Sequence, residues 1–185
     1  NGNIEGRCVN DGCQVGEVNR GVITAETLEL KAGTKGAADG VEGEGNTNID
    51  VEDRMAVALK GGSYVYGISS DAETVVDAGK LLDMDLVSGD DGTGFSLGNT
   101  GSLKVRADDM DVDVTASRTG RLMRVSAHDS DSKAEISGVR GDMKVTAEGD
   151  AYGVQISANA TPGAKATLDF TEKLTLEIEG NHAYG

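Results

Sequence analysis

The stretch SLKVRADDMDVDVTA (Ser102–Ala116) decides the fold of the chain, because its apolar residues fall at every second position. Two such runs lie in it: Leu103 and Val105, then Met110, Val112 and Val114. Successive side chains of a β-strand point to opposite faces, so a period of two predicts strands with one buried face.

The second of these runs recurs along the whole chain. Its copies begin at Leu28, Met55, Leu82, Met110, Met143 and Leu174, in steps of 27, 27, 28, 33 and 31 residues. A supersecondary unit repeated at such an interval is the signature of a solenoid, in which each unit buries its apolar face against its neighbours.

Two more apolar series keep step with the first. The preceding series consists of Ile23, Ile49, Val76, Leu103, Ala134 and Ala166, and the following series of Val41, Ile68, Phe95, Met123 and Val154. Each repeat therefore holds three short strands, separated by the Gly, Asp, Asn, Ser and Thr residues that turns favour. We predict an all-β chain that forms a right-handed parallel β-helix of about six coils over residues 21–185. An antiparallel β-sandwich is the alternative, but it would not keep three series in phase.

Composition limits the partners of this solenoid. The 185 residues include 17 Lys and Arg against 32 Asp and Glu, a formal charge of −15, which argues against binding nucleic acid or anionic lipid. The chain has four Tyr, two Phe and no Trp, so the core must consist of stacked aliphatic side chains. No run approaches the roughly 20 apolar residues that a membrane-spanning helix needs.

A Gly-, Asp-, Thr- and Ser-rich acidic solenoid of this kind resembles the passenger domains of autotransporters, which are surface proteins of Gram-negative bacteria. The resemblance is carried by Ser102–Ala116 and by KVTAEGDAYGVQISANA (Lys144–Ala160). It implies export across the outer membrane to the cell surface and a non-enzymatic role as adhesin or structural stalk. The implied partners are a host-cell or matrix protein, a glycan, or a second copy of the chain.

In that family a C-terminal β-barrel anchors the passenger in the membrane. This sequence ends inside a repeat at Gly185, so we expect it to be a segment of a longer passenger whose barrel is absent here.

Residues 1–20 are expected to lie outside the repeat as an N-terminal cap. They contain Cys8 and Cys13, and a metal site would need more ligands than two cysteines. A redox pair would favour Cys-x-x-Cys spacing. A disulfide between Cys8 and Cys13 fits a secreted protein best, and it would close a small loop at the open end of the coil.

Catalysis has little support in the sequence. His128, Asp129 and Ser130 are adjacent, and neighbouring side chains of an extended chain cannot converge as a triad. The alternative function is a polysaccharide-active β-helix enzyme, a lyase or hydrolase, which would need clustered carboxylates and a basic residue on one face.

Outward positions of the third and fourth copies carry four aspartates: Asp83, Asp85, Asp111 and Asp113. Coils lie about 4.8 Å apart, so these carboxylates should meet directly. A hydrated acidic face and a weak Ca²⁺ site are the two interpretations, since Ca²⁺ prefers oxygen ligands.

Arg140, Gly141 and Asp142 form an Arg-Gly-Asp tripeptide, the integrin-recognition signal of some matrix and bacterial surface proteins. They end the segment Ser137–Asp142, which we take as a loop inserted before Met143 in the longest repeat. A projecting loop would favour receptor binding. The alternative is a coincidence of composition.

Overall fold

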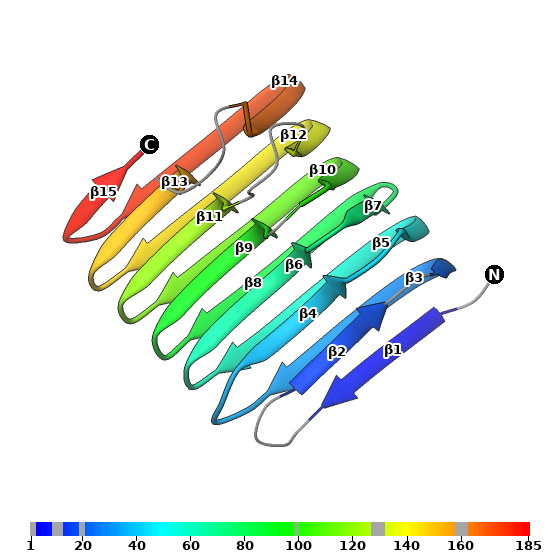
Figure 1. Ribbon diagram of the computed structural model, residues 1–185, viewed down its shortest axis with the longest axis horizontal. Coiled ribbons are helices and arrows are strands. Elements are labelled where there is room, and N and C mark those ends of the chain that lie inside the picture. Colours follow the sequence, from blue (N-terminus) through cyan, green and yellow to red (C-terminus); the bar gives the residue numbers. More distant parts are fainter. Residues whose placement is uncertain (1–2, 9–12, 19–20, 99, 127–131, 158–162) are drawn as a thin grey trace.

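The computed structural model describes residues 3–8, 13–18, 21–98, 100–126, 132–157 and 163–185; for the first two ranges it describes the backbone alone. Every regular element in these ranges is a β-strand. The strands form two parallel sheets of eight and seven strands, here called sheet A and sheet B. Figure 1 shows the strands of each sheet side by side in chain order, from β1 to β14 and from β2 to β15.

The chain alternates between the two sheets. Sheet A consists of β1 (Asn3–Cys8), β3 (Gly21–Gly33), β5 (Thr47–Gly61), β7 (Glu73–Asp77), β8 (Leu81–Ser88), β10 (Ser102–Ala116), β12 (Lys133–Ala147) and β14 (Lys165–Glu179). Sheet B consists of β2 (Cys13–Val18), β4 (Ala38–Gly43), β6 (Tyr64–Ser70), β9 (Asp91–Leu97), β11 (Thr119–Val125), β13 (Asp150–Ile156) and β15 (His182–Tyr184). The result is a parallel β-helix, as the three apolar series predict, with about five turns where we expected about six coils.

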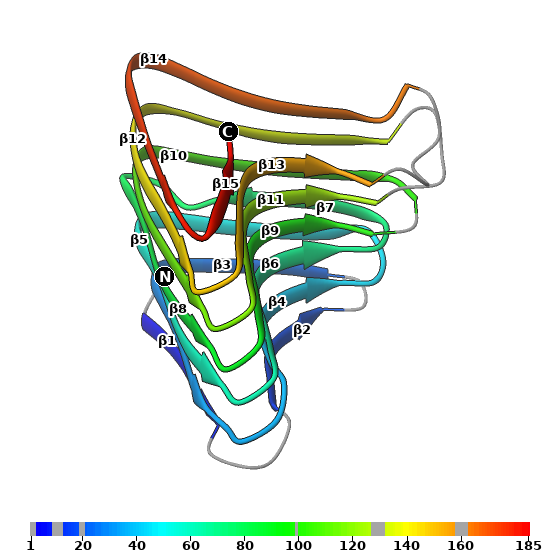
Figure 2. The same ribbon diagram turned by 90° about the vertical axis from the view of Figure 1, so that its left-hand side faces the viewer.

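Two of the three predicted strands of each repeat are joined into one long strand of sheet A. Figure 2 shows that these long strands bend once and wrap around the outside of the coil, while sheet B lies inside the bend. In the third repeat the bend divides the strand into β7 and β8, at Gly79, whose φ is +65°. A Cβ at Gly79 would lie 2.3 Å from the carbonyl oxygen of Glu52, so the corner requires glycine.

The core is a set of aliphatic columns between the two sheets. Leu28, Met55, Leu82 and Met110 pair in register along sheet A, as predicted, and each is at most 2% exposed. The series on sheet B is confirmed throughout: Val41, Ile68, Phe95, Met123 and Val154 stand opposite one another.

The predicted register is wrong by two residues in the fifth copy. Met143 pairs with Val112, and Gly141 takes the place beside Met110 and Leu174. A Cβ at Gly141 would lie 2.9 Å from the ring of Phe170, so that ring occupies the space left in the column. The extra residues of this repeat are those between β11 and β12, and no loop precedes Met143.

In the preceding apolar series the predicted register is also wrong by two residues, between the third and fourth copies. Val105 pairs with Val76, and Leu103 pairs with Thr74. Thr74 points inward and is fully buried, and its hydroxyl receives a hydrogen bond of 2.8 Å from the hydroxyl of Ser70. A satisfied buried threonine carries no apolar signal, so an alignment of apolar residues passes over it.

The N-terminal segment does not lie outside the repeat. β1 pairs with β3, with Ile4 opposite Leu28, and β2 pairs with β4. Residues 3–8 and 13–18 therefore extend the two sheets by one more strand each, where we expected a separate cap.

The columns make a direct prediction about stability. Met110 is 2% exposed between Leu82 and Gly141, so Met110→Asp places a charge in a dry stack and should abolish folding. Thr115→Asp introduces the same charge on the exposed side of the same strand and should leave the β-sheet signal intact. Far-UV circular dichroism during thermal melting measures both. A Met110→Asp variant as stable as Thr115→Asp would contradict the columns.

Candidate functional site

The Arg-Gly-Asp tripeptide lies within β12, and the expectation of a projecting loop is wrong. Arg140 stands opposite Asp109 of β10, and its Nε and Nη2 each donate a hydrogen bond of 2.8 Å to that carboxylate. Asp142 stands opposite Asp111. The strand fixes the positions of both charges, and the guanidinium is already held by a bidentate partner.

The four predicted aspartates come together as an acidic ladder on the outer face of sheet A. Asp83 pairs with Asp111 and Asp85 with Asp113. The corrected register adds Asp142 on the far side of Asp111, and it places Lys144 beside Asp113. We call the five aspartates Asp83, Asp85, Asp111, Asp113 and Asp142 the acidic ladder.

Desolvation, followed by mutual repulsion, raises the pKa values of two carboxyls in the acidic ladder. Desolvation raises the pKa of Asp111 above its ordinary value, and the charges of Asp113, Asp83 and Asp142 raise it further. Desolvation and Asp85 likewise raise the pKa of Asp113, with Lys144 acting in the opposite direction.

Two cations, Arg54 and Lys144, border the acidic ladder. Arg54 forms an ion pair with Asp83 at 2.5 Å. Lys144 has a different partner, Glu177, at 3.2 Å. Within the described residues no group of three or more His, Cys, Asp or Glu side chains has the arrangement of a metal site. The weak Ca²⁺ site therefore gains no support from this face, and it stays a prediction.

Asp111→Asn should stabilise the protein at neutral pH. It removes one of three like charges that stand directly opposite one another, an effect of about 0.2–1 kcal/mol for such pairs. Because the folded pKa of Asp111 is raised, the wild type loses stability as pH rises through that pKa. The advantage of the variant should thus vanish below the ordinary pKa of aspartate.

The matched control is Asp109→Asn in the same strand. Arg140 holds the pKa of Asp109 below its ordinary value, so this carboxylate stabilises the fold above its ordinary pKa. The control should lower the melting temperature at neutral pH. Melting curves of the two variants that shift in the same direction would show that the ladder carries no specific repulsion.

Two predicted features fall outside the described residues. The side chains of Cys8 and Cys13 are among them, although the backbone of each ends or begins a strand, β1 and β2 respectively. The run His128–Ser130 is the other. The disulfide stays a prediction.

Sequence reasoning missed the inner corner of sheet B. The pairing of its strands skips one position near the middle, at Gly40, Gly67, Gly94, Leu122 and Gly153. A Cβ at Gly67 would lie 2.7 Å from the carbonyl oxygen of Gly94, so the close approach of neighbouring strands requires glycine there. Figure 2 shows that sheet B bends inward.

Outward side chains on the two sides of these skipped positions face each other across the bend. One column consists of Asp39, Tyr66, Thr93, Arg121 and Tyr152, and the other of Glu42, Ser69, Ser96, Arg124 and Gln155. We call the concave surface between them the inner-corner groove. It contains Tyr66 and Tyr152, two of the four tyrosines of the chain.

Near the C-terminal end, side chains fill the groove. Arg121 donates a hydrogen bond of 2.6 Å from Nε to Oε1 of Gln155, across the bend. Its guanidinium carbon lies 5.8 Å from the ring centre of Tyr152, within the range of a cation–π contact. The other face of Tyr152 stacks on Tyr184, with ring centres 4.8 Å apart.

Nearer the N-terminus, between β4 and β11, the groove is open. A depression of about 310 Å³ lies there, and Asp39, Tyr66, Ser69, Ser96 and Arg124 are among the residues that line it. Ser69 and Ser96 have short side chains, which leave this part of the groove unfilled. Burial raises the pKa of Asp39.

The sequence did hold one signal for this corner. Tyr66-Gly67, Tyr152-Gly153 and Tyr184-Gly185 repeat a Tyr-Gly pair. In the first two pairs the glycine lies at the bend of sheet B, and the tyrosine beside it lines the groove. An apolar pattern marks inward positions alone, so it gives no reason to group the outward residues on either side of a bend.

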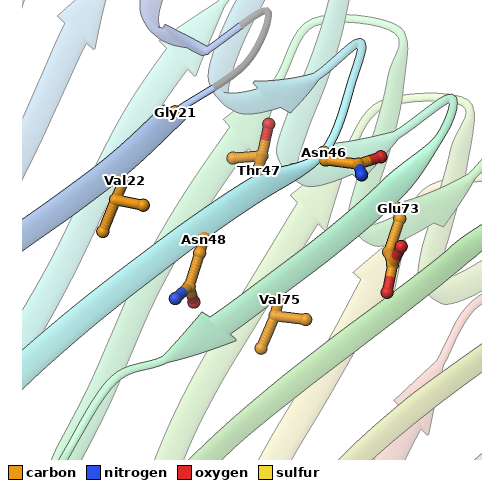
Figure 3. Close-up of a pocket in the computed structure, with 7 residues that line it drawn as sticks. All are labelled: Gly21, Val22, Asn46, Thr47, Asn48, Glu73 and Val75. Atoms are coloured by element: carbon orange, nitrogen blue, oxygen red, sulfur yellow. The ribbon is translucent and has the colours of Figure 1, made fainter.

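A second depression lies on the outer face of sheet A and measures about 460 Å³. Figure 3 shows Val22, Asn48 and Val75 in a row on three successive strands, with Thr47 and Glu73 beside them. Val22 is 70% exposed. Thr47 is buried at 3% exposure, while Val22, Asn48 and Glu73 are exposed, so the polar groups here do not converge as they do in the inner corner.

Comparison with known proteins adds no relative. No family model, no curated protein and no solved structure matches the chain. The described residues also contain no helix long and apolar enough to cross a membrane.

Proposed function

We propose that the chain is a non-enzymatic segment of an exported surface protein, which works as an adhesive surface or as the stalk that carries one. The supporting observation is the unbroken parallel stacking of both sheets, which produces long faces on which outward side chains repeat from strand to strand. Solenoids bind partners along such extended faces. The charge of −15 supports solubility outside the cell and opposes adhesion to anionic polymers by simple charge attraction.

The proposal predicts that animal cells attach to surfaces coated with the folded protein. Attachment should exceed that to albumin, which is another acidic protein, and it should be lost after thermal unfolding. Attachment no greater than to albumin would reject the adhesive role and leave the stalk.

Asp142→Glu tests whether the tripeptide contributes. Because Arg140 is held by Asp109 and Asp142 lies within a strand, we expect equal attachment to this variant and to the wild type. A clear loss of attachment with Asp142→Glu would restore the receptor-binding interpretation of Arg140, Gly141 and Asp142.

The polysaccharide-active enzyme is favoured by one observation. Asp39, a half-buried carboxyl with a raised pKa, lines the same depression as Arg124. A carboxyl tuned in this way can serve as a general acid. Incubation with neutral and acidic polysaccharides, followed by measurement of new reducing ends, separates an enzyme from a binding surface.

A further inference from the structure

The open part of the inner-corner groove holds charges without partners. Within the described part of the chain, the side chains of Asp39 and Arg124 both line the depression, and neither makes a hydrogen bond or ion pair. Their strands, β4 and β11, stand three steps apart in sheet B, or roughly 14 Å at the usual strand spacing. An acceptor and a five-fold donor thus mark the two ends of a polar trough.

Hydroxyl groups form part of the trough between these ends. Ser69 donates its hydroxyl hydrogen to the carbonyl oxygen of Val41 at 3.3 Å, and Ser126 donates to that of Leu97 at 3.4 Å. Both oxygens keep lone pairs that can accept hydrogen bonds from a ligand. Tyr66 adds an aromatic ring and a phenolic hydroxyl on the opposite side of the bend.

We propose that this trough is a binding site for a neutral oligosaccharide, two or three sugar residues of which lie along the open groove. The proposal deepens the adhesive function above, since it names a glycan as the partner. Sugar hydroxyls can donate to Asp39 and to the serine oxygens and accept from Arg124, while the apolar edge of a sugar ring contacts Tyr66. Each contact uses a group that the fold leaves available.

The charges around the trough select against other ligands. Asp39, Glu42 and Asp71 line the depression with Arg124, so the lining carries more negative than positive charge. The chain as a whole carries −15. A polyanionic glycan would meet net repulsion from these three carboxylates, which outnumber Arg124. The described acidic residues do not form a metal site either, which leaves a neutral, hydroxyl-rich ligand as the best match.

The test measures binding of defined glycans to the whole chain by calorimetry and by amide chemical shifts. The probes are the neutral hexasaccharides of glucose, mannose and galactose in their common linkages, with hexagalacturonate as the anionic counterpart. At least one neutral hexasaccharide should bind and shift amide signals of β4, β6, β9 and β11. Hexagalacturonate should bind more weakly than that neutral glycan.

Two variants remove the charged ends of the trough. Arg124→Ala and Asp39→Asn should each weaken binding by about tenfold, the loss expected for one charge-assisted hydrogen bond. Ser69→Tyr should block binding by filling the floor without removing either charge. Circular dichroism and melting curves establish that each variant is folded.

Matched controls lie on the outer face of sheet A. Arg106→Ala and Asp50→Asn remove the same residue types from exposed strand positions far from the groove, and binding should stay within about twofold of the wild type. The inference is overturned if no neutral hexasaccharide binds, if shifts fall on sheet A, if hexagalacturonate binds more tightly, or if the groove variants bind like the controls.

The outcomes separate this site from the adhesive role. Cells that attach to the wild type and equally to folded Arg124→Ala, with no neutral glycan bound, would overturn the trough and leave adhesion standing. Glycan binding without attachment would reject adhesion and support the trough.

Discussion

The structure depends on one constraint, which is the stacking of equivalent inward side chains on parallel strands about 4.8 Å apart. The strands of sheet A from β3 to β14 contribute their apolar residues to columns that no single turn could bury alone. A shift of one residue would turn every inward side chain to solvent. A shift of two residues would keep the faces but change which residues meet. The outward ladders and the inner-corner groove follow from this same register.

Apolar periodicity therefore predicts which side chains of a strand point inward better than it predicts which residues of neighbouring strands stand opposite one another. The parallel β-helix and the columns beginning at Leu28 and Val41 could be read from the sequence, because both features repeat with nearly constant spacing. The fifth copy could not. Met143 and Gly141 are two residues apart and both point inward, and Gly141 has no side chain to mark it as a core position. Buried Thr74 hides the register of the preceding series for a related reason.

The slip of two residues changes the interpretation of the surface. It moves the tripeptide from a supposed insertion into β12, where Arg140 is held by Asp109. It also extends the acidic ladder to Asp142 and places Lys144 beside Asp113. The repulsion among the aspartates was predictable from their alternation alone, but the cations that border them were not. Ion pairs between turns join residues about thirty positions apart, and they depend on the register.

The inner corner of sheet B is a feature that the alternation of apolar and polar residues does not predict. Glycines such as Gly67 allow neighbouring strands of sheet B to approach closely where they bend. The bend directs outward side chains from its two arms toward each other, which makes a groove from residues that are ordinary surface positions in the sequence. Where arginine, tyrosine and glutamine meet, the groove is filled, and where serines stand, it is open. The glycan-binding proposal rests on this shape and on the charges of Asp39 and Arg124, which are unpaired within the described residues, whereas the adhesive role rests on the long parallel faces.

The register itself is the central claim, and solution NMR tests it most directly. Backbone cross-strand contacts between β10 and β12 report which residues stand opposite one another. The structure predicts contacts that link Asp111 with Asp142 and Val112 with Met143. Contacts that instead link Met110 with Met143 and Asp111 with Lys144 would restore the simple repeat alignment. They would contradict the corrected column, the extended ladder and the placement of the tripeptide together.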